Sequence, residues 1–129
     1  YMFSASPAPG TIAAVRESLR LLRSEPQLRE RLWRNVQFIY QGLKQAGFTL
    51  YPDPPESAIL TLLIGHDAVV HGMSRDLYEG GLLTSTVVYP AVPPNEGKMR
   101  LSLSAAHTEE ALSRALDVIT AAGRQHGII

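Results

Sequence analysis

Two basic side chains near the C-terminal end, Lys98 and Arg100, are the residues of this 129-residue chain best suited to bind an anion. They lie in a segment where apolar and polar residues alternate, which is typical of a strand with one buried face. Both side chains are therefore expected on the same face, where two cations could hold an anionic substrate. The alternatives are an exposed strand face or a structural partner for Arg100, because Ser102 and Ser104 cannot neutralise its charge.

Other side chains that could do chemistry are sparse. The histidines lack the spacing that places two metal ligands on one helical face, and the chain has no cysteine. We therefore predict no metal site, no disulfide and no thiol nucleophile. His107 directly precedes an expected helix cap, where it should make a structural hydrogen bond. Lys44 is expected on a solvated helix face, and no glycine-rich pattern for nucleotide phosphates is present.

Composition limits the classes of partner and the compartment. Twelve basic and twelve acidic residues give a net charge of zero, so no overall field attracts the chain to nucleic acid or an anionic membrane. The hydrophobic content of 45% is sufficient for the packed core of one domain. The longest strongly apolar run, Ala58 to Ile64, is far shorter than the roughly 20 residues that cross a bilayer. The first residues lack the features of a signal peptide, so we expect a globular cytoplasmic protein.

Two helices are predicted in the first third of the chain. From Thr11 onward, apolar residues recur at intervals of three and four and form one face: Ile12, Val15, Leu19 and Leu22. Arginines lie on the opposite side: Arg16, Arg20 and Arg23. The second helix follows Ser24-Glu25-Pro26, an N-cap with an early proline, and ends at the C-cap Gly47. The arginine-rich surface from Arg16 to Arg34 is interpreted as solvated or as facing another subunit.

The remaining residues predict a small mixed domain. The prolines at 52–55 exclude regular structure, and Ala58–Ile64 is predicted to be a strand buried on both faces. A helix over 68–79 ends at Gly80-Gly81, and strands are expected over 82–89 and around 99–104. Thr108 caps a last helix that ends near Gly123. We predict one α+β domain over residues 1–129, with a short, mostly antiparallel sheet packed by about four helices.

Three segments together resemble a known enzyme family. They are Phe3-Ser4-Ala5-Ser6-x-x-Pro9 before the first helix, Tyr89-Pro90-Ala91-Val92-Pro93 in a loop, and the stretch from Arg100 to Thr108. In this order they resemble the C-terminal, small domain of the α-oxoamine synthases, which are pyridoxal-phosphate-dependent acyltransferases of fold-type I. The Ser-Ala-Ala-His-Thr sequence that ends the third segment is the most specific part of the resemblance, which spans the whole chain.

The resemblance implies roles for three residues. Arg100 stands where the family's arginine binds the α-carboxylate of the amino-acid substrate, a role that suits its planar guanidinium. Ser4 and Ala5 stand where a turn reaches the phosphate of pyridoxal 5'-phosphate in the neighbouring subunit, which implies a homodimer. Ala5 lacks the hydroxyl that many members carry there, and Val88 stands where some members have a second arginine.

The resemblance also implies a reaction. Members of this family condense an amino acid with an acyl thioester such as acyl-CoA and release carbon dioxide. The lysine that holds the cofactor belongs to a large upstream domain, so this chain is expected to be a fragment that is inactive when isolated. Two alternatives remain open: the small domain of a class I/II aminotransferase, and a non-catalytic, stand-alone interaction module.

Overall fold

A computed structural model describes residue 2 and residues 5–129 of the chain. The described residues form four helices: α1 (Pro9–Ser24), α2 (Pro26–Ala46), α3 (Asp67–Glu79) and α4 (Glu109–Gln125). They also form four strands: β1 (Leu50–Tyr51), β2 (Ile59–Gly65), β3 (Ser85–Val87) and β4 (Gly97–Ser102). The strands make one sheet in the order β1-β2-β4-β3, and every neighbouring pair is antiparallel. The predicted α+β class with a short antiparallel sheet is confirmed.

Local sequence signals set the helix ends. Pro26 occupies the first turn of α2, where its missing N–H removes no helical hydrogen bond. Gly47 ends α2 with φ at 106°, a left-handed conformation in which glycine has no Cβ to strain. The hydroxyl of Thr108 accepts a hydrogen bond of 3.2 Å from the Ala111 amide and caps α4. Each of these signals was predicted, although α4 continues two residues beyond Gly123.

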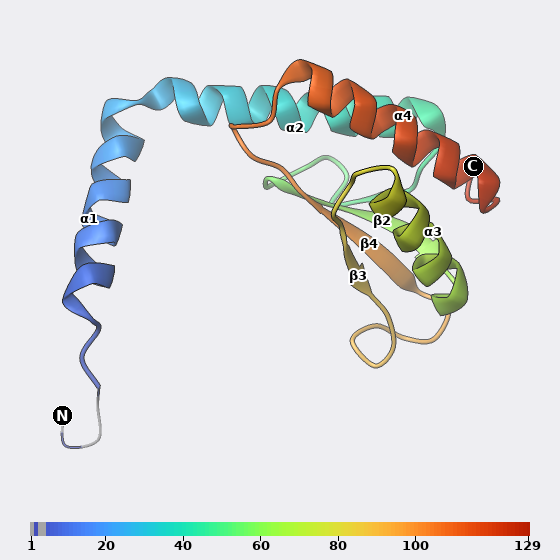
Figure 1. Cartoon of the computed structure of the whole chain (residues 1–129), viewed down its shortest axis with the longest axis horizontal. Helices are drawn as coiled ribbons and strands as arrows, with labels where there is room; N and C mark the ends of the chain where they lie inside the picture. The colour runs from blue at the N-terminus through green and yellow to red at the C-terminus, as the bar shows by residue number, and fades with distance from the viewer. Residues whose placement is uncertain (1, 3–4) are drawn as a thin grey trace.

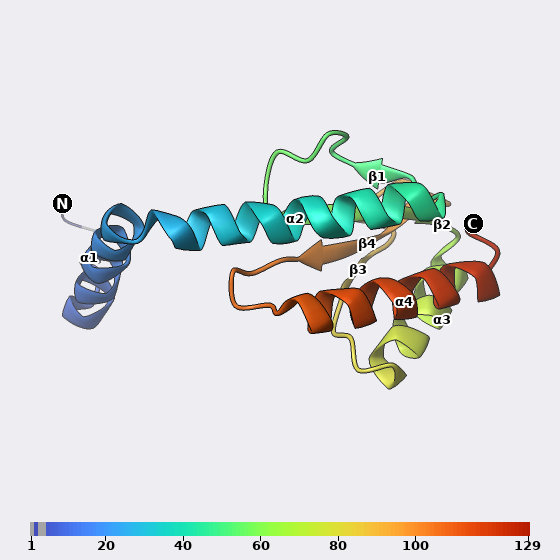
Figure 2. The same ribbon diagram turned by 90° about the horizontal axis from the view of Figure 1, so that it is seen from above.

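One prediction about the sheet is wrong. Strand β2 is buried on one face only, because α2, α3 and α4 lie together on a single side of the sheet (Figures 1 and 2). Leu60, Leu62 and Ile64 point to the helices and are buried, whereas Ile59 is 43% exposed. The prediction also missed the two-residue strand β1, and β3 is shorter than the expected strand over 82–89.

The hydrophobic core lies between this buried sheet face and the three helices. Leu62 pairs with Leu50 on one side and with Met99 on the other, and all three are at most 2% exposed. The helices contribute further residues that are fully or almost fully buried: Val36, Ile39, Leu43, Val70, Met73, Leu77 and Ile119. None of the helices in the described part of the chain covers the second face of the sheet, so its side chains remain available to a ligand or another surface.

Helix α1 stands apart from this core. Figure 1 shows it extending away from the end of α2 at a steep angle, and none of its residues is buried. Its amphipathic pattern was predicted, but the apolar side faces no other part of the described chain. No helix among the described residues is long and apolar enough to cross a membrane.

Candidate functional site

The uncovered face of the sheet carries Arg100 and Lys98. Both come from β4, whose buried residues Met99 and Leu101 point to the opposite side. The strand register places Arg100 between Thr61 of β2 and Ser85 of β3. The predicted placement of the two basic side chains on one face is confirmed, and we call this face of the sheet the open face.

Arg100 is exposed and has only one weak polar contact in the described part of the chain. Its Nη2 donates to the Ser85 hydroxyl at 3.5 Å, the outer limit for a hydrogen bond. No carboxylate of the described residues lies within ion-pair distance of the guanidinium. The structure therefore does not support a purely structural ion pair for Arg100, and its planar donors remain free for an anion.

Lys98 takes a different position from Arg100 on the same face. Its ammonium lies 5.6 Å from the centre of the Tyr51 ring, within the range of a cation–π contact. Tyr51 comes from β1 and Lys98 from β4, and β2 lies between these strands, so the two side chains meet across β2. The open face thus combines two cations with the hydroxyls of Thr61 and Ser85. This set of groups can bind a carboxylate, but it includes no side chain that would act as a general base.

Of the other two predicted site residues, only Ala5 is described, and it is not brought to the open face. Ser4 lies outside the described residues. Ala5 is exposed and precedes α1, the helix that Figure 1 shows extending away from the sheet. Because its side chain is a methyl group, Ala5 can offer only backbone groups to a phosphate. No contact within the described chain links it to Arg100.

Asn35 fixes the loop between β4 and α4, and sequence reasoning missed it. The residue is 7% exposed, and its side-chain amide donates to the carbonyls of Ser104 at 2.9 Å and His107 at 3.1 Å. The Ser104 amide also donates to Nδ1 of His107 at 3.2 Å, which confirms a structural hydrogen bond for this histidine. A polar residue on the inner face of α2, beside Val36, was the available signal.

A surface cluster connects α2 to the loop after β1. Lys44 Nζ and the Tyr40 hydroxyl both donate to the carboxylate of Asp53. The hydrogen bond from Lys44, followed by the one from Tyr40, lowers the pKa of Asp53 below its ordinary value. The same contact raises the pKa of Lys44. Lys44 is therefore an ion-paired residue at the surface, rather than simply solvated as predicted.

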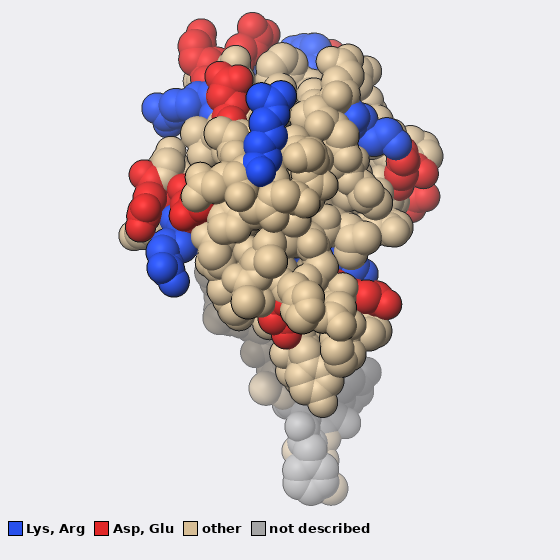
Figure 3. Space-filling model, turned by 90° about the vertical axis from the view of Figure 1, so that its right-hand side faces the viewer, with Lys and Arg blue, Asp and Glu red and all other residues tan. Residues whose placement is uncertain are grey.

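The surface charge is mixed. Figure 3 shows Lys and Arg interspersed with Asp and Glu around a broad uncharged area, on the side of the molecule that carries the end of α4. This pattern agrees with the net charge of zero and gives no basic stripe for a nucleic acid on this face.

The sequence that forms this fold, including the Arg100 segment, matches a known protein family. The family Aminotransferase class I and II matches residues 1–119, and the chain belongs to this family. Within it, the chain is 36% identical over 129 residues to 2-amino-3-ketobutyrate coenzyme A ligase of Salmonella typhimurium. It is 33% identical to 8-amino-7-oxononanoate synthase of Thermoanaerobacter pseudethanolicus. Each alignment covers the whole chain but 32% of the relative, so the chain spans about a third of these relatives.

Solved structures give the same result for the fold. Serine palmitoyltransferase of Sphingomonas wittichii is 32% identical, with a TM-score of 0.90 over 98% of this chain and 32% of that protein. A structure of SPT with PLP is 34% identical, with a TM-score of 0.91 and the same two coverages. The family match, the two relatives and these structures together confirm the resemblance inferred from the three segments.

Proposed function

We propose that this chain is the C-terminal small domain of a pyridoxal-phosphate-dependent acyltransferase, which condenses an amino acid with an acyl thioester such as acyl-CoA and releases carbon dioxide. The domain spans residues 1–129, and a large domain would make up the remaining two thirds of the enzyme. The observation that carries this proposal is the exposed Arg100 on the open face, which has no carboxylate partner in the described chain and lies in the family-specific segment. The names of the relatives given above support the transfer of an acyl group to an amino acid.

Arg100 would bind the α-carboxylate of the amino acid. Its guanidinium can donate two parallel N–H bonds to the two carboxylate oxygens, which fixes the direction of the substrate as well as its position. The Ser85 hydroxyl, across the strand pair from Arg100, would help to orient the guanidinium. Lys98 adds positive potential on the same face while its ammonium rests against Tyr51.

The described residues do not form a cofactor site by themselves. Lys44 and Lys98 are the only amines of lysine in the chain, and they contact Asp53 and Tyr51. Ala5 has no hydroxyl for a phosphate. Pyridoxal phosphate would therefore be held mainly by the large domain, and the segment at Ser4 and Ala5 would approach the cofactor of the neighbouring subunit in a homodimer. The homodimer and the cytoplasmic location are part of the same proposal; sedimentation of the full enzyme and cell fractionation test them.

The reaction can be tested by the release of free CoA thiol from acyl-CoA by the intact enzyme. We expect thiol release only when an amino acid is present, together with one carbon dioxide for each thiol. An enzyme that instead transfers the amino group to a keto acid, with no need for acyl-CoA, would be an aminotransferase. That result would contradict the proposed reaction and would leave the family unchanged.

A further inference from the structure

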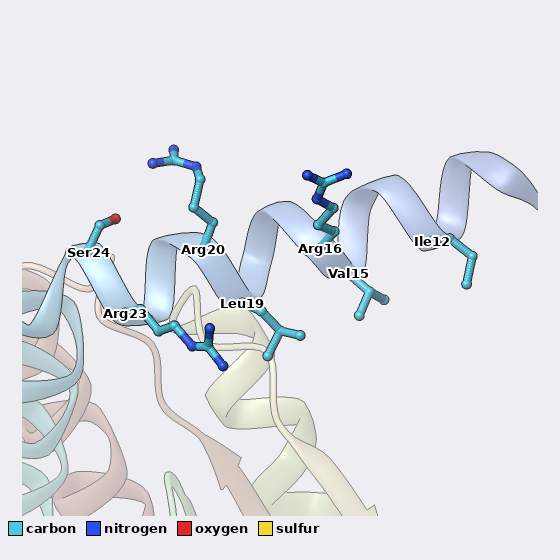
Figure 4. Close-up of a pocket in the computed structure, with 7 residues that line it drawn as sticks. All are labelled: Ile12, Val15, Arg16, Leu19, Arg20, Arg23 and Ser24. Atoms are coloured by element: carbon cyan, nitrogen blue, oxygen red, sulfur yellow. The ribbon is translucent and has the colours of Figure 1, made fainter.

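The apolar side of α1 is a surface feature that the proposed function does not use. Its four residues lie three or four positions apart on one side of the helix and are exposed to solvent: Ile12 54%, Val15 52%, Leu19 52% and Leu22 61%. Figure 4 shows Ile12, Val15 and Leu19 pointing in the same direction, away from the helix axis. We call these four residues the α1 apolar face.

This face requires a partner for physical reasons. A helix of 16 residues is barely stable alone in water, and most helices in proteins are stabilised by packing of their apolar side. Helix α1 packs against α2 at their junction, but none of its own residues becomes buried there. A contiguous exposed apolar surface of this kind is typical of a contact with another part of a protein.

Charges beside the α1 apolar face restrict what the partner can be. Arg20 is paired with Glu17 of the same helix at 2.6 Å. Arg16 and Arg23 have no ion-pair partner among the described residues. Figure 4 shows Arg16 and Arg20 on the side away from the apolar residues, as predicted, whereas Arg23 points to the same side as Leu19, contrary to the prediction. A complementary surface would be apolar, with Asp or Glu at the edge that meets Arg23.

We propose that the α1 apolar face packs against the large domain of the same enzyme, on an apolar surface edged by Asp or Glu. This inference rests on the proposed function, because that function requires a large domain. The relatives are about three times as long as this chain, so they contain enough additional protein to cover the helix. A second copy of α1 fits less well. The one acidic residue of that helix, Glu17, is already paired with Arg20 and is not free to meet Arg23.

Hydrogen–deuterium exchange, followed by mass spectrometry, tests the packing of α1. The intact enzyme is compared with the 129-residue chain. We expect the amides of α1 to exchange at least about tenfold more slowly in the intact enzyme, because packing reduces local opening, while the amides of α2 change little. Leu19→Asp in the intact enzyme should restore fast exchange in α1. Ala13→Asp introduces the same charge on the opposite side of α1 and should leave the exchange slow.

Two results would overturn the inference. Fast exchange of α1 in the intact enzyme would show that no large domain covers it. Slow exchange in the 129-residue chain that increases with concentration, together with a dimer in sedimentation, would show that a second copy covers it. The comparison of the two unmodified proteins decides the matter even if Leu19→Asp fails to fold. Failure of the proposed reaction would be seen in thiol release and would leave these exchange rates unaffected.

Discussion

Replacement of Arg100 in the intact enzyme should weaken amino-acid binding without unfolding the domain. The side chain is exposed on β4, and its one polar contact is the 3.5 Å contact with Ser85. Substitutions at such surface positions usually change stability by less than about 0.5 kcal/mol. An effect on the reaction can therefore be separated from an effect on folding by measuring the unfolding midpoint of each variant.

The size of the effect follows from the two hydrogen bonds that the guanidinium can give to a carboxylate. A hydrogen bond to a charged group contributes about 1.5–3 kcal/mol, so two contribute roughly 3–6 kcal/mol. Because about 1.4 kcal/mol is a factor of ten in affinity, Arg100→Ala should raise the amino-acid KM by roughly 10² to 10⁴. Arg100→Lys keeps the charge but loses the paired geometry, so its effect should be intermediate.

The assay is thiol release at varied amino-acid and acyl-CoA concentrations. The KM for acyl-CoA should stay within about twofold of the unmodified enzyme, because Arg100 is assigned to the amino acid alone. Arg114→Ala is the control, since this arginine is also exposed but belongs to α4. An unchanged amino-acid KM in Arg100→Ala would refute the assignment of Arg100 to the carboxylate.

Three further predictions concern stability, measured by urea unfolding. Asn35→Ala should destabilise the fold by about 1–3 kcal/mol, because two loop carbonyls lose their hydrogen-bond donor. The control Gln41→Ala, on the exposed side of α2, should have little effect. Equal losses of stability in the two variants would contradict the role of Asn35. Gly123→Ala should destabilise by about 1–3 kcal/mol, since the new Cβ would lie 2.3 Å from Cζ of Phe48; a gain in stability would show that the ring can move. The pKa of Asp53 is lowered in the folded state, so its contribution is full above its ordinary pKa of 3.8 and is lost as the pH falls. Asp53→Asn should therefore lower the midpoint at pH 7 but not at pH 2, and the same shift at both would be inconsistent with the Lys44 contact.

Much of the fold could be predicted because its signals are local. Pro26, Gly47 and Thr108 act through the backbone of their own helix end, so their effect does not depend on the rest of the structure. Strand β2 was harder, because a continuous apolar run does not show how many of its faces are covered. Strand β1 has only two residues and is defined by its pairing with Thr61 and Leu62, which no local pattern reveals.

The candidate site, like the fold, could be predicted only where the pattern is local. The alternation of residues in β4 correctly placed Lys98 and Arg100 on one face. Their neighbours Ser85 and Tyr51 could not be predicted, because the register between strands depends on the packing of the whole sheet. The burial of Asn35 also depends on a contact across about 70 positions of the chain, with the loop after β4.

The mass of the polypeptide that carries this sequence in its native cell tests the central claim most directly. The chain is 129 residues long and matches 32% of a relative, so a small domain of this family should belong to a subunit of about 400 residues. Detection of such a subunit by intact mass spectrometry is the result we predict. A mature polypeptide of 129 residues would contradict the account, because it would have no large domain to hold the cofactor.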